Sequence, residues 1–263
     1  MKKWILVLVL AFGCAKKEED KNTLKIAASP VPHAQILEFV KPILKDQGIN
    51  LKIIEVDDYN IPNRSLAEKE VDANFFQHAP FMEQQIKAFG YKIQCYASIH
   101  LEPMAIYSEK LKSIDEIPNG GIIALPNDPT NEYRALAILQ KKGLIKLREG
   151  ATLQATKADI QSNPKNLKFQ EIDAAMLPRT LRDVDAAAIP TNYALQGGLN
   201  PSRDALAMES VDSPYANILT IRDGDDKDPR LEALRKELLS DKMRAFILEK
   251  YQGAVIPVLT DCR

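Results

Sequence analysis

The sequence predicts an α/β fold with two lobes, and three observations support this. Strand-like segments, in which apolar and polar residues alternate, are followed along the chain by helix-like segments, in which apolar residues recur every three or four positions. This order is typical of α/β proteins with mostly parallel strand pairing. The alternation restarts near Gly120, which indicates a second lobe. The length of 263 residues suits one large domain or two modest ones.

The first cycle of strands and helices begins with a strand at Leu24–Ser29. Apolar residues then follow at helical spacing from Ile36 to Leu44, so we expect a helix that Pro42 kinks or shortens. The remaining elements of this cycle are, in order, the strand Ile49–Val56, the short helix Arg64–Glu70, the strand Ala73–His78, the helix Pro80–Phe89, and the extended segments Ile93–Ser98 and Met104–Ser108.

The second cycle starts with a strand at Gly121–Leu125 and a well-marked helix. Asp128 can cap that helix, Pro129 suits its first position, and Gly143 lies just past its end. The elements expected after it are the strand Leu167–Ile172, the short helix Leu177–Asp183, the strand Ala186–Ile189, the helix Asn192–Gly197, the strand Ala216–Arg222, and the helices Pro229–Leu239 and Asp241–Gln252, the last capped by Ser240 and ended by Gly253.

Two polar linkers, Ser108–Asn119 and Gly198–Ser213, are the candidate crossings between the lobes. If the last strand and helices rejoin the first lobe, the lobes are joined by a two-pass hinge, and ligands favour such interfaces. The pattern leaves a third small domain as an alternative. We expect residues 24–108 plus 218–263 to form lobe I and residues 109–217 to form lobe II.

The N-terminal segment has the features of an export signal. Three residues with two lysines precede the nine apolar residues Trp4–Phe12, and Gly13 and Cys14 follow. A spanning helix needs about 20 apolar residues, so this stretch is too short for a membrane anchor. We expect residues 1–13 to be a lipoprotein signal peptide and Cys14 to be lipidated; an ordinary signal peptide with an incidental cysteine is the alternative. The charged residues that follow indicate a tether over 14–23.

Composition and missing motifs exclude several functions. The net charge of −1 lacks the basic excess of a nucleic-acid-binding protein. No zinc, phosphate-binding, dinucleotide-binding or nucleophile-elbow motif occurs, so we expect no catalytic residue, metal or cofactor. Cys95 and Cys262 can form a disulfide in an exported protein, but we favour a buried Cys95 in a strand and an unpaired Cys262 in a loose tail.

Six further segments, in this order and spacing, resemble the NlpA-type lipoprotein family, which supplies methionine to an ABC importer. The segments are Ala28–Ala34 (ASPVPHA), Asp58–Asn63 (DYNIPN), Val71–Pro80 (VDANFFQHAP), Glu102–Ser108 (EPMAIYS), Pro126–Asn131 (PNDPTN) with Arg134–Leu136 (RAL), and Asp212–Asn217 (DSPYAN). The resemblance runs from about Leu24 to Arg222. It implies a fold of the periplasmic-binding-protein type (type II-like) and a monomer on a lipid anchor, at the cell membrane and facing the periplasm or exterior. Its implied partners are methionine, a membrane permease and separate ATPase subunits.

The residue chemistry suits a free amino acid. Arg134 offers a planar donor for bidentate pairing with a carboxylate, and the nearby helix start can share the anion. Phe76 and His78 are two apart in one strand and therefore share a face, where they can supply an apolar wall and a polar contact. Tyr59 can form a second wall, since a thioether favours aromatic contacts. Without the resemblance, a surface arginine and ordinary core residues would explain these positions equally well or better.

Asn217 and Asn192 are the candidate amides, because asparagine can contact either an ammonium or a carboxylate. Asn217 matches the family's Ser-Pro-Tyr-x-Asn segment. The family commonly has asparagine directly after Ile189, where this chain has Pro190. Asn192 either compensates for that change or only starts the next helix.

Alternative functions remain at this stage. The nearest are binding of another small apolar amino acid or of a methionine-containing dipeptide. An exported enzyme on the same fold would have only Cys95 with His78 or His100 as a nucleophile-like set, and an apolar strand disfavours a reactive thiolate. A lipid-tethered surface adhesin is the third alternative.

Overall fold

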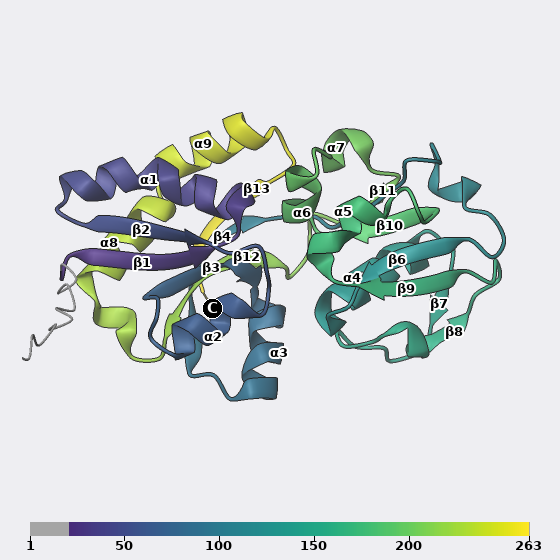
Figure 1. Ribbon diagram of the computed structural model, residues 1–263, viewed down its shortest axis with the longest axis horizontal. Coiled ribbons are helices and arrows are strands. Elements are labelled where there is room, and N and C mark those ends of the chain that lie inside the picture. Colours follow the sequence, from purple (N-terminus) through teal and green to yellow (C-terminus); the bar gives the residue numbers. More distant parts are fainter. Residues whose placement is uncertain (1–20, 263) are drawn as a thin grey trace, which may run out of the picture.

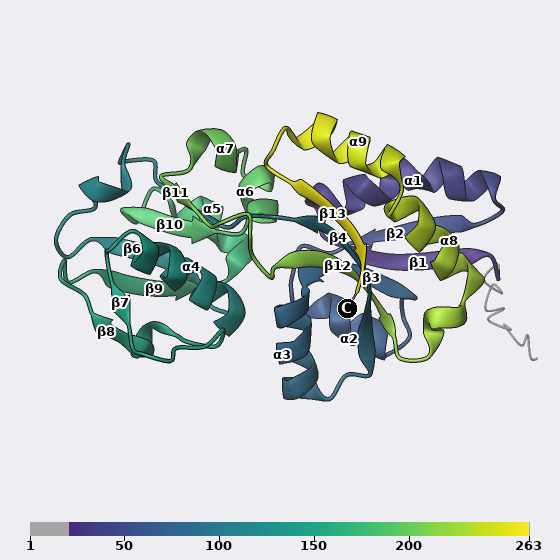
Figure 2. The ribbon, with the colours of Figure 1, turned by 180° about the vertical axis from the view of Figure 1, so that it is seen from behind.

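The structure of the chain is a computed structural model, and it describes residues 21–262. The expected signal peptide, the lipidated Cys14 and most of the tether lie outside the described residues. Figure 1 shows the two lobes side by side, and Figure 2 shows them from behind. Within residues 21–262, no helix has both the length and the apolar character needed to cross a membrane.

Lobe I is built on a six-stranded sheet in the order β13-β4-β12-β3-β1-β2. Its strands are β1 (Thr23–Ala28), β2 (Asn50–Glu55), β3 (Ala73–His78), β4 (Ile93–Leu101), β12 (Ala216–Arg222) and β13 (Ile256–Asp261). The helices α1 (Gln35–Asp46), α8 (Pro229–Leu238) and α9 (Asp241–Tyr251) pack on one face, and α2 (Ile61–Ala67) and α3 (Ala79–Phe89) pack on the other. Alternation along β1 serves both faces, since Ile26 joins the first core and Ala27 the second.

Lobe II is built on a five-stranded sheet in the order β11-β5-β10-β6-β9. Its strands are β5 (Ala105–Tyr107), β6 (Ile122–Pro126), β9 (Lys168–Ile172), β10 (Ala186–Ile189) and β11 (Ala207–Met208), with a separate ribbon of β7 (Lys146–Leu147) and β8 (Ile160–Ser162). The helix α4 (Pro129–Lys141) covers one face, and α5 (Leu177–Thr180) and α6 (Thr191–Gln196) cover the other; α7 (Pro201–Asp204) follows them.

The strand pairing is mixed, so the expectation of mostly parallel pairing is wrong. Strand β1 pairs in parallel with β2 and β3, and β6 pairs in parallel with β9 and β10. Strand β12 lies antiparallel between β3 and β4 because it enters lobe I on the return pass from lobe II. Strand β13, which the sequence pattern did not reveal, adds to the outer edge of β4.

The first crossing between the lobes lies earlier than the expected linker Ser108–Asn119. β4 ends at Leu101 in the large sheet, and β5 begins at Ala105 in the small sheet, so the chain changes lobes over residues 102–104. The expected lobe boundary at Ser108 therefore places β5 in the wrong sheet. The return crossing runs from β11 to β12 over residues 209–215, at the end of the second expected linker.

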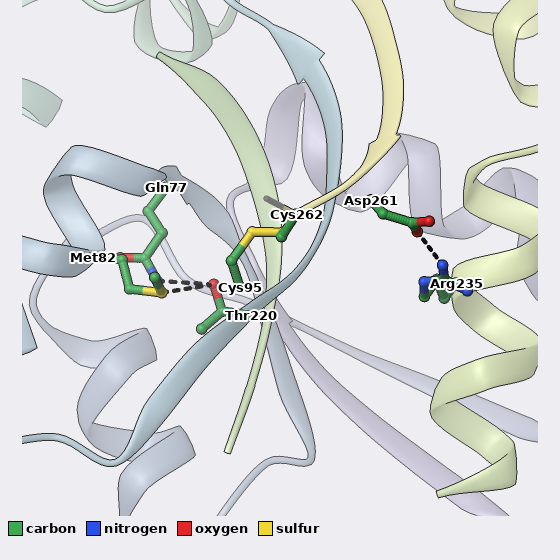
Figure 3. The surroundings of a disulfide bond; sticks show 7 residues. All are labelled: Gln77, Met82, Cys95, Thr220, Arg235, Asp261 and Cys262. Carbon is green, nitrogen blue, oxygen red and sulfur yellow. Dashed lines mark hydrogen bonds and ion pairs between the residues drawn. A yellow bond between two sulfur atoms is a disulfide. The ribbon is translucent and has the colours of Figure 1, made fainter. Parts of the chain in front are cut away.

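Cys95 and Cys262 form a disulfide, so the expectation of a loose Cys262 is wrong. Their Cα atoms are 5.9 Å apart, because β13 carries the C-terminal end alongside β4. Figure 3 shows the bond, together with the Arg235–Asp261 ion pair that holds β13 to α8. The C-terminal end is thus attached to lobe I by a strand ladder, an ion pair and a covalent bond.

Local sequence signals placed several helix ends correctly. The Asp128 side chain accepts a hydrogen bond from Asn131 N at 3.0 Å and caps α4, and Ser240 caps α9. The helix α2 lies three residues earlier than expected. Pro42 does not shorten α1, which runs through it to Asp46. Pro42 is exposed, so water can reach the backbone carbonyl that lacks its donor there.

Candidate functional site

A cavity of about 340 Å³, counting the space that opens to solvent, lies between the lobes. The carboxyl ends of β1, β2 and β3 all meet the edge of the sheet that faces lobe II, which is where α/β proteins usually bind ligands. The residues that line the cavity are Tyr59, Phe76, Gln77, His78, Phe81, Glu102, Asn131, Arg134, Pro190, Thr191, Asn192 and Asn217. All six predicted site residues are among them.

Three aromatic rings form one wall of the cavity. The ring centroids of Tyr59, Phe76 and Phe81 are 5.8 to 6.0 Å apart, in edge-to-face or tilted contact. Phe76 is held by the fully buried strand β3, and Phe81 lies in the first turn of α3. This wall suits an apolar or thioether side chain.

Two side-chain hydrogen bonds join the lobes across the cavity. The Tyr59 hydroxyl donates to Asn192 Oδ1 at 2.7 Å, and His78 Nε2 lies 3.2 Å from Asn131 Oδ1. His78 Nδ1 accepts a hydrogen bond from Phe81 N, so its proton is on Nε2 and points to Asn131. The structure therefore has the lobes closed over the cavity.

Arg134 is buried and mostly engaged by the protein itself. Nε and Nη2 donate to the two carboxylate oxygens of Glu209 at 3.2 and 2.7 Å, Nη2 also donates to the Glu102 carbonyl, and Nη1 donates to Asn131 Oδ1. The guanidinium also stacks on Tyr215, with Cζ 4.5 Å from the ring centroid. Glu209 thus occupies the two donors that were expected to pair with a ligand carboxylate. Among the described residues, one hydrogen on Nη1 has no acceptor.

The charge of Arg134 is stabilised although the side chain is buried. Burial acts to lower its pKa, but the charge and hydrogen bonds of Glu209, with smaller contributions from tyrosines, raise the pKa above its ordinary value. A protonated guanidinium therefore faces the cavity.

The two predicted amides both offer donors. Asn192 is the second residue of α6 and does not cap it; its Oδ1 accepts from Tyr59, and its buried Nδ2 has no partner among the described residues. Asn217 Oδ1 lies 2.9 Å from His33 Nε2, which leaves its Nδ2 for the cavity. Pro190 also lines the cavity, so Asn192 supplies an amide close to the position where the family commonly has one.

Glu102 is the one carboxylate among the residues that line the cavity. Its Oε1 is 2.7 Å from His100 Nε2 and 3.3 Å from His33 Nε2, and all three residues are buried. Burial raises the pKa of Glu102, while His33, Arg134 and the Asn192 backbone amide act in the opposite direction. A cation placed beside this carboxylate would favour its ionised form.

Within residues 21–262, these three side chains form the cluster that could bind a metal ion, since their donor atoms lie within 4.8 Å of one another. Both imidazoles direct Nε2 at a single oxygen, and the 2.7 Å separation is a hydrogen-bond length. Hydrogen bonding therefore explains the cluster, and the donor set does not require an ion.

Comparison with known proteins identifies the family of the chain. The family model for the NlpA lipoprotein matches residues 24–259. This chain belongs to the NlpA lipoprotein family. The "Methionine-binding lipoprotein MetQ" of Bacillus subtilis (strain 168) is 42% identical over 246 residues, 92% of this chain and 90% of that protein.

Two solved structures of relatives share the fold of this NlpA family member. "The structure of a nutrient binding protein from Burkholderia cenocepacia bound to methionine" has a TM-score of 0.87 and 42% identity, covering 89% of this chain and 99% of that one. A periplasmic substrate-binding protein of an ABC transporter from Coxiella burnetii has a TM-score of 0.85 and 43% identity, covering 89% and 100%. The resemblance inferred from the six sequence segments is confirmed.

The sequence of this NlpA family member did not reveal the roles of Glu102 and Asn131 in the cavity lining, or of Glu209 as the partner of Arg134. Glu102 lay inside a segment used for the resemblance but received no role. One signal was available: it is the single acidic residue in the largely apolar stretch 99–107, where a charge is costly unless it has a use.

We predict that the histidines make the fold acid-sensitive. Burial lowers the pKa of His100 from 6.5 to about 3, so between these values the unfolded chain binds a proton that the folded chain does not. The free energy of unfolding therefore falls as the pH falls, by about 1.4 kcal/mol per pH unit for this group. In urea unfolding between pH 6 and 4.5, His100→Gln should reduce the slope by that amount. Identical slopes in the two proteins would contradict the buried neutral imidazole.

Proposed function

We propose that the protein is a lipid-anchored substrate-binding protein of an ABC importer, which binds methionine in the interlobe cavity and delivers it to a membrane permease driven by separate ATPase subunits. The observation that carries the proposal is that the Glu102 carboxylate and the Arg134 guanidinium both line one closed interlobe cavity. An α-amino acid carries its ammonium and carboxylate on the same carbon. It therefore needs an acceptor and a donor that lie next to each other.

The proposed contacts follow from which groups remain available. Glu102 takes the ammonium. The free Nη1–H of Arg134 and the Nδ2 groups of Asn192 and Asn217 donate to the carboxylate. The side chain lies against Tyr59, Phe76 and Phe81, where sulfur–aromatic contacts contribute about 0.3–1.5 kcal/mol each.

The proposed protein acts by binding and does not catalyse a reaction. The enzyme alternative relied on a Cys95 thiolate, and this sulfur is in a disulfide with Cys262. The closed cavity with cross-lobe hydrogen bonds favours a protein that encloses its ligand, as a monomer, and presents both lobes to the permease.

We expect soluble protein that begins after Cys14 to bind one L-methionine per chain. A ligand at 100 times its dissociation constant stabilises the folded state by about 2.7 kcal/mol, so the melting temperature should rise. Thermal melts with a panel of amino acids and methionine-containing dipeptides, followed by calorimetry, provide the measurement. If methionine gives no shift while another ligand gives a clear one, the methionine assignment fails.

The proposed anchor has a separate test. Cys14→Ser should move the protein from the membrane fraction to the soluble fraction, because the nine-residue apolar stretch is too short to hold it. Fractionation after a salt wash is the measurement, with Cys95→Ser as the matched control, which should stay with the membrane. A Cys14→Ser protein that remains membrane-bound would refute lipidation as the anchor.

A further inference from the structure

His33 does not line the cavity, yet it hydrogen-bonds one side chain that does, Asn217, and lies beside a second, Glu102. Its Nε2 lies 2.9 Å from Asn217 Oδ1 and 3.3 Å from Glu102 Oε1. The residue is 1% exposed, so it contacts neither solvent nor a ligand in the cavity. Any effect of His33 on ligand binding must therefore pass through a neighbouring side chain, and its hydrogen bond leads to Asn217.

The contacts determine where the imidazole carries its proton. Two oxygen acceptors face Nε2, whereas Nδ1 has no partner among the described residues. The proton therefore belongs on Nε2, and the ring donates it to Asn217 Oδ1. Burial, opposed in part by Glu102, lowers the pKa of His33 to about 4, so the ring is neutral near pH 7.

The surroundings hold this ring in place. It packs edge-on against Phe75, with centroids 4.7 Å apart, and against His100 at 4.9 Å. The backbone just before it is tied to the C-terminal helix, since the Tyr251 hydroxyl lies 3.2 Å from the Pro32 carbonyl. A donor this well fixed can determine the orientation of its acceptor.

The orientation of Asn217 matters because an amide has two different ends. If Oδ1 is held by His33, Nδ2 is left for the cavity, where it can donate to a carboxylate. A rotated amide would present Oδ1 to the same carboxylate and repel it. The start of β12 does not fix this choice, because backbone pairing with His78 and His100 leaves the side-chain rotation free.

We propose that His33 is the positioning residue of the site: by donating from Nε2 to Asn217 Oδ1, it directs the amide N–H of Asn217 toward the ligand carboxylate. The proposal rests on the proposed function for the identity of the ligand.

The first test needs no ligand. In ¹⁵N-labelled protein at pH 7, the His33 ring nitrogens should show the shifts of a neutral ring protonated at Nε2, with the resonance assigned from the spectrum of His33→Gln. A neutral ring protonated at Nδ1 has no Nε2–H to donate to Asn217 Oδ1 and would overturn the proposal. This result stands even if the protein does not bind methionine, in which case calorimetry of the parent protein shows that the proposed function is what fails.

The second test uses methionine calorimetry on folded variants. His33→Leu fills the volume without a donor and should weaken binding about tenfold or more. His33→Gln supplies an amide N–H in the same direction and should recover binding to within about threefold of the parent. Equal losses for the two variants, or full affinity of His33→Leu, would overturn the proposal.

A double-mutant cycle separates positioning from a general structural effect. His33→Leu combined with Asn217→Ala should bind about as weakly as Asn217→Ala alone, because His33 has no amide left to orient. The control cycle pairs Asn217→Ala with Tyr59→Leu, which changes the aromatic wall at a residue whose hydroxyl donates to Asn192, and its losses should multiply. If the losses of the His33 cycle also multiply fully, His33 does not act through Asn217 and the proposal is wrong.

Discussion

Arg134→Met is expected to reduce methionine affinity by about 100-fold or more, because it removes a charged donor from a buried carboxylate contact worth ~3 kcal/mol. The same change should also destabilise the fold, since Glu209 would lose its partner while its side chain is only 11% exposed. Breaking a buried ion pair from one side costs about 3–5 kcal/mol. Calorimetry and urea unfolding measure the two losses separately.

The double variant Arg134→Met/Glu209→Gln separates the two effects. Removing both charges leaves no unpaired buried carboxylate, so stability should largely return, whereas binding should not. The matched control is Arg148→Met, which breaks the exposed Arg148–Asp159 pair and should cost less than about 1 kcal/mol and no affinity. Methionine binding by the stable double variant at parental affinity would show that Arg134 does not contact the ligand.

Glu102→Gln is the second change with a large expected effect. The glutamine keeps an oxygen that can accept from His100, so the fold should survive, but the charge opposite the ligand ammonium is lost. Hydrogen bonds to charged groups are worth about 1.5–3 kcal/mol, which predicts a loss of roughly 10- to 150-fold. Glu132→Gln, which changes a buried carboxylate outside the cavity that accepts from Lys157 N, is the control and should bind normally.

The pH dependence of binding gives Glu102 a second readout. Burial raises the pKa of Glu102, and a ligand ammonium beside it would lower the pKa again. Binding then releases the proton from Glu102. Methionine affinity should therefore be highest above the raised pKa and should decrease as the pH falls through it. Glu102→Gln should remove this dependence. A variant that keeps the full pH dependence would place the titrating group elsewhere.

The parts of the fold that the sequence predicted are those with local causes. The α4 helix begins where Asp128 caps it, and β10 follows from the apolar run Ala186–Ile189. The errors concern pairing partners far apart in the chain. The apolar segments on either side of Glu102 gave no sign that they belong to different sheets. Strand β13 lies near the C-terminal end, and its pairing partner β4 is far from it in the sequence.

The same distinction applies to the site. Phe76 and His78 could be placed on one face because a strand has a period of two, and both line the cavity. The capture of Arg134 by Glu209 could not be foreseen, since the partners are 75 positions apart and meet only after the return crossing forms. The orientation of Asn217 is equally hidden, because His33 is 184 positions away.

The Cys95–Cys262 disulfide closes residues 95–262 into a covalent ring. The two cysteines are 167 positions apart, and all of lobe II together with both crossings lies between them. A protease that cuts one peptide bond in the largely exposed loop 148–154 therefore opens the ring without releasing a fragment. For a protein expected to work outside the cytoplasm, the bond means that after a single cut in this loop all strands of both sheets remain covalently connected.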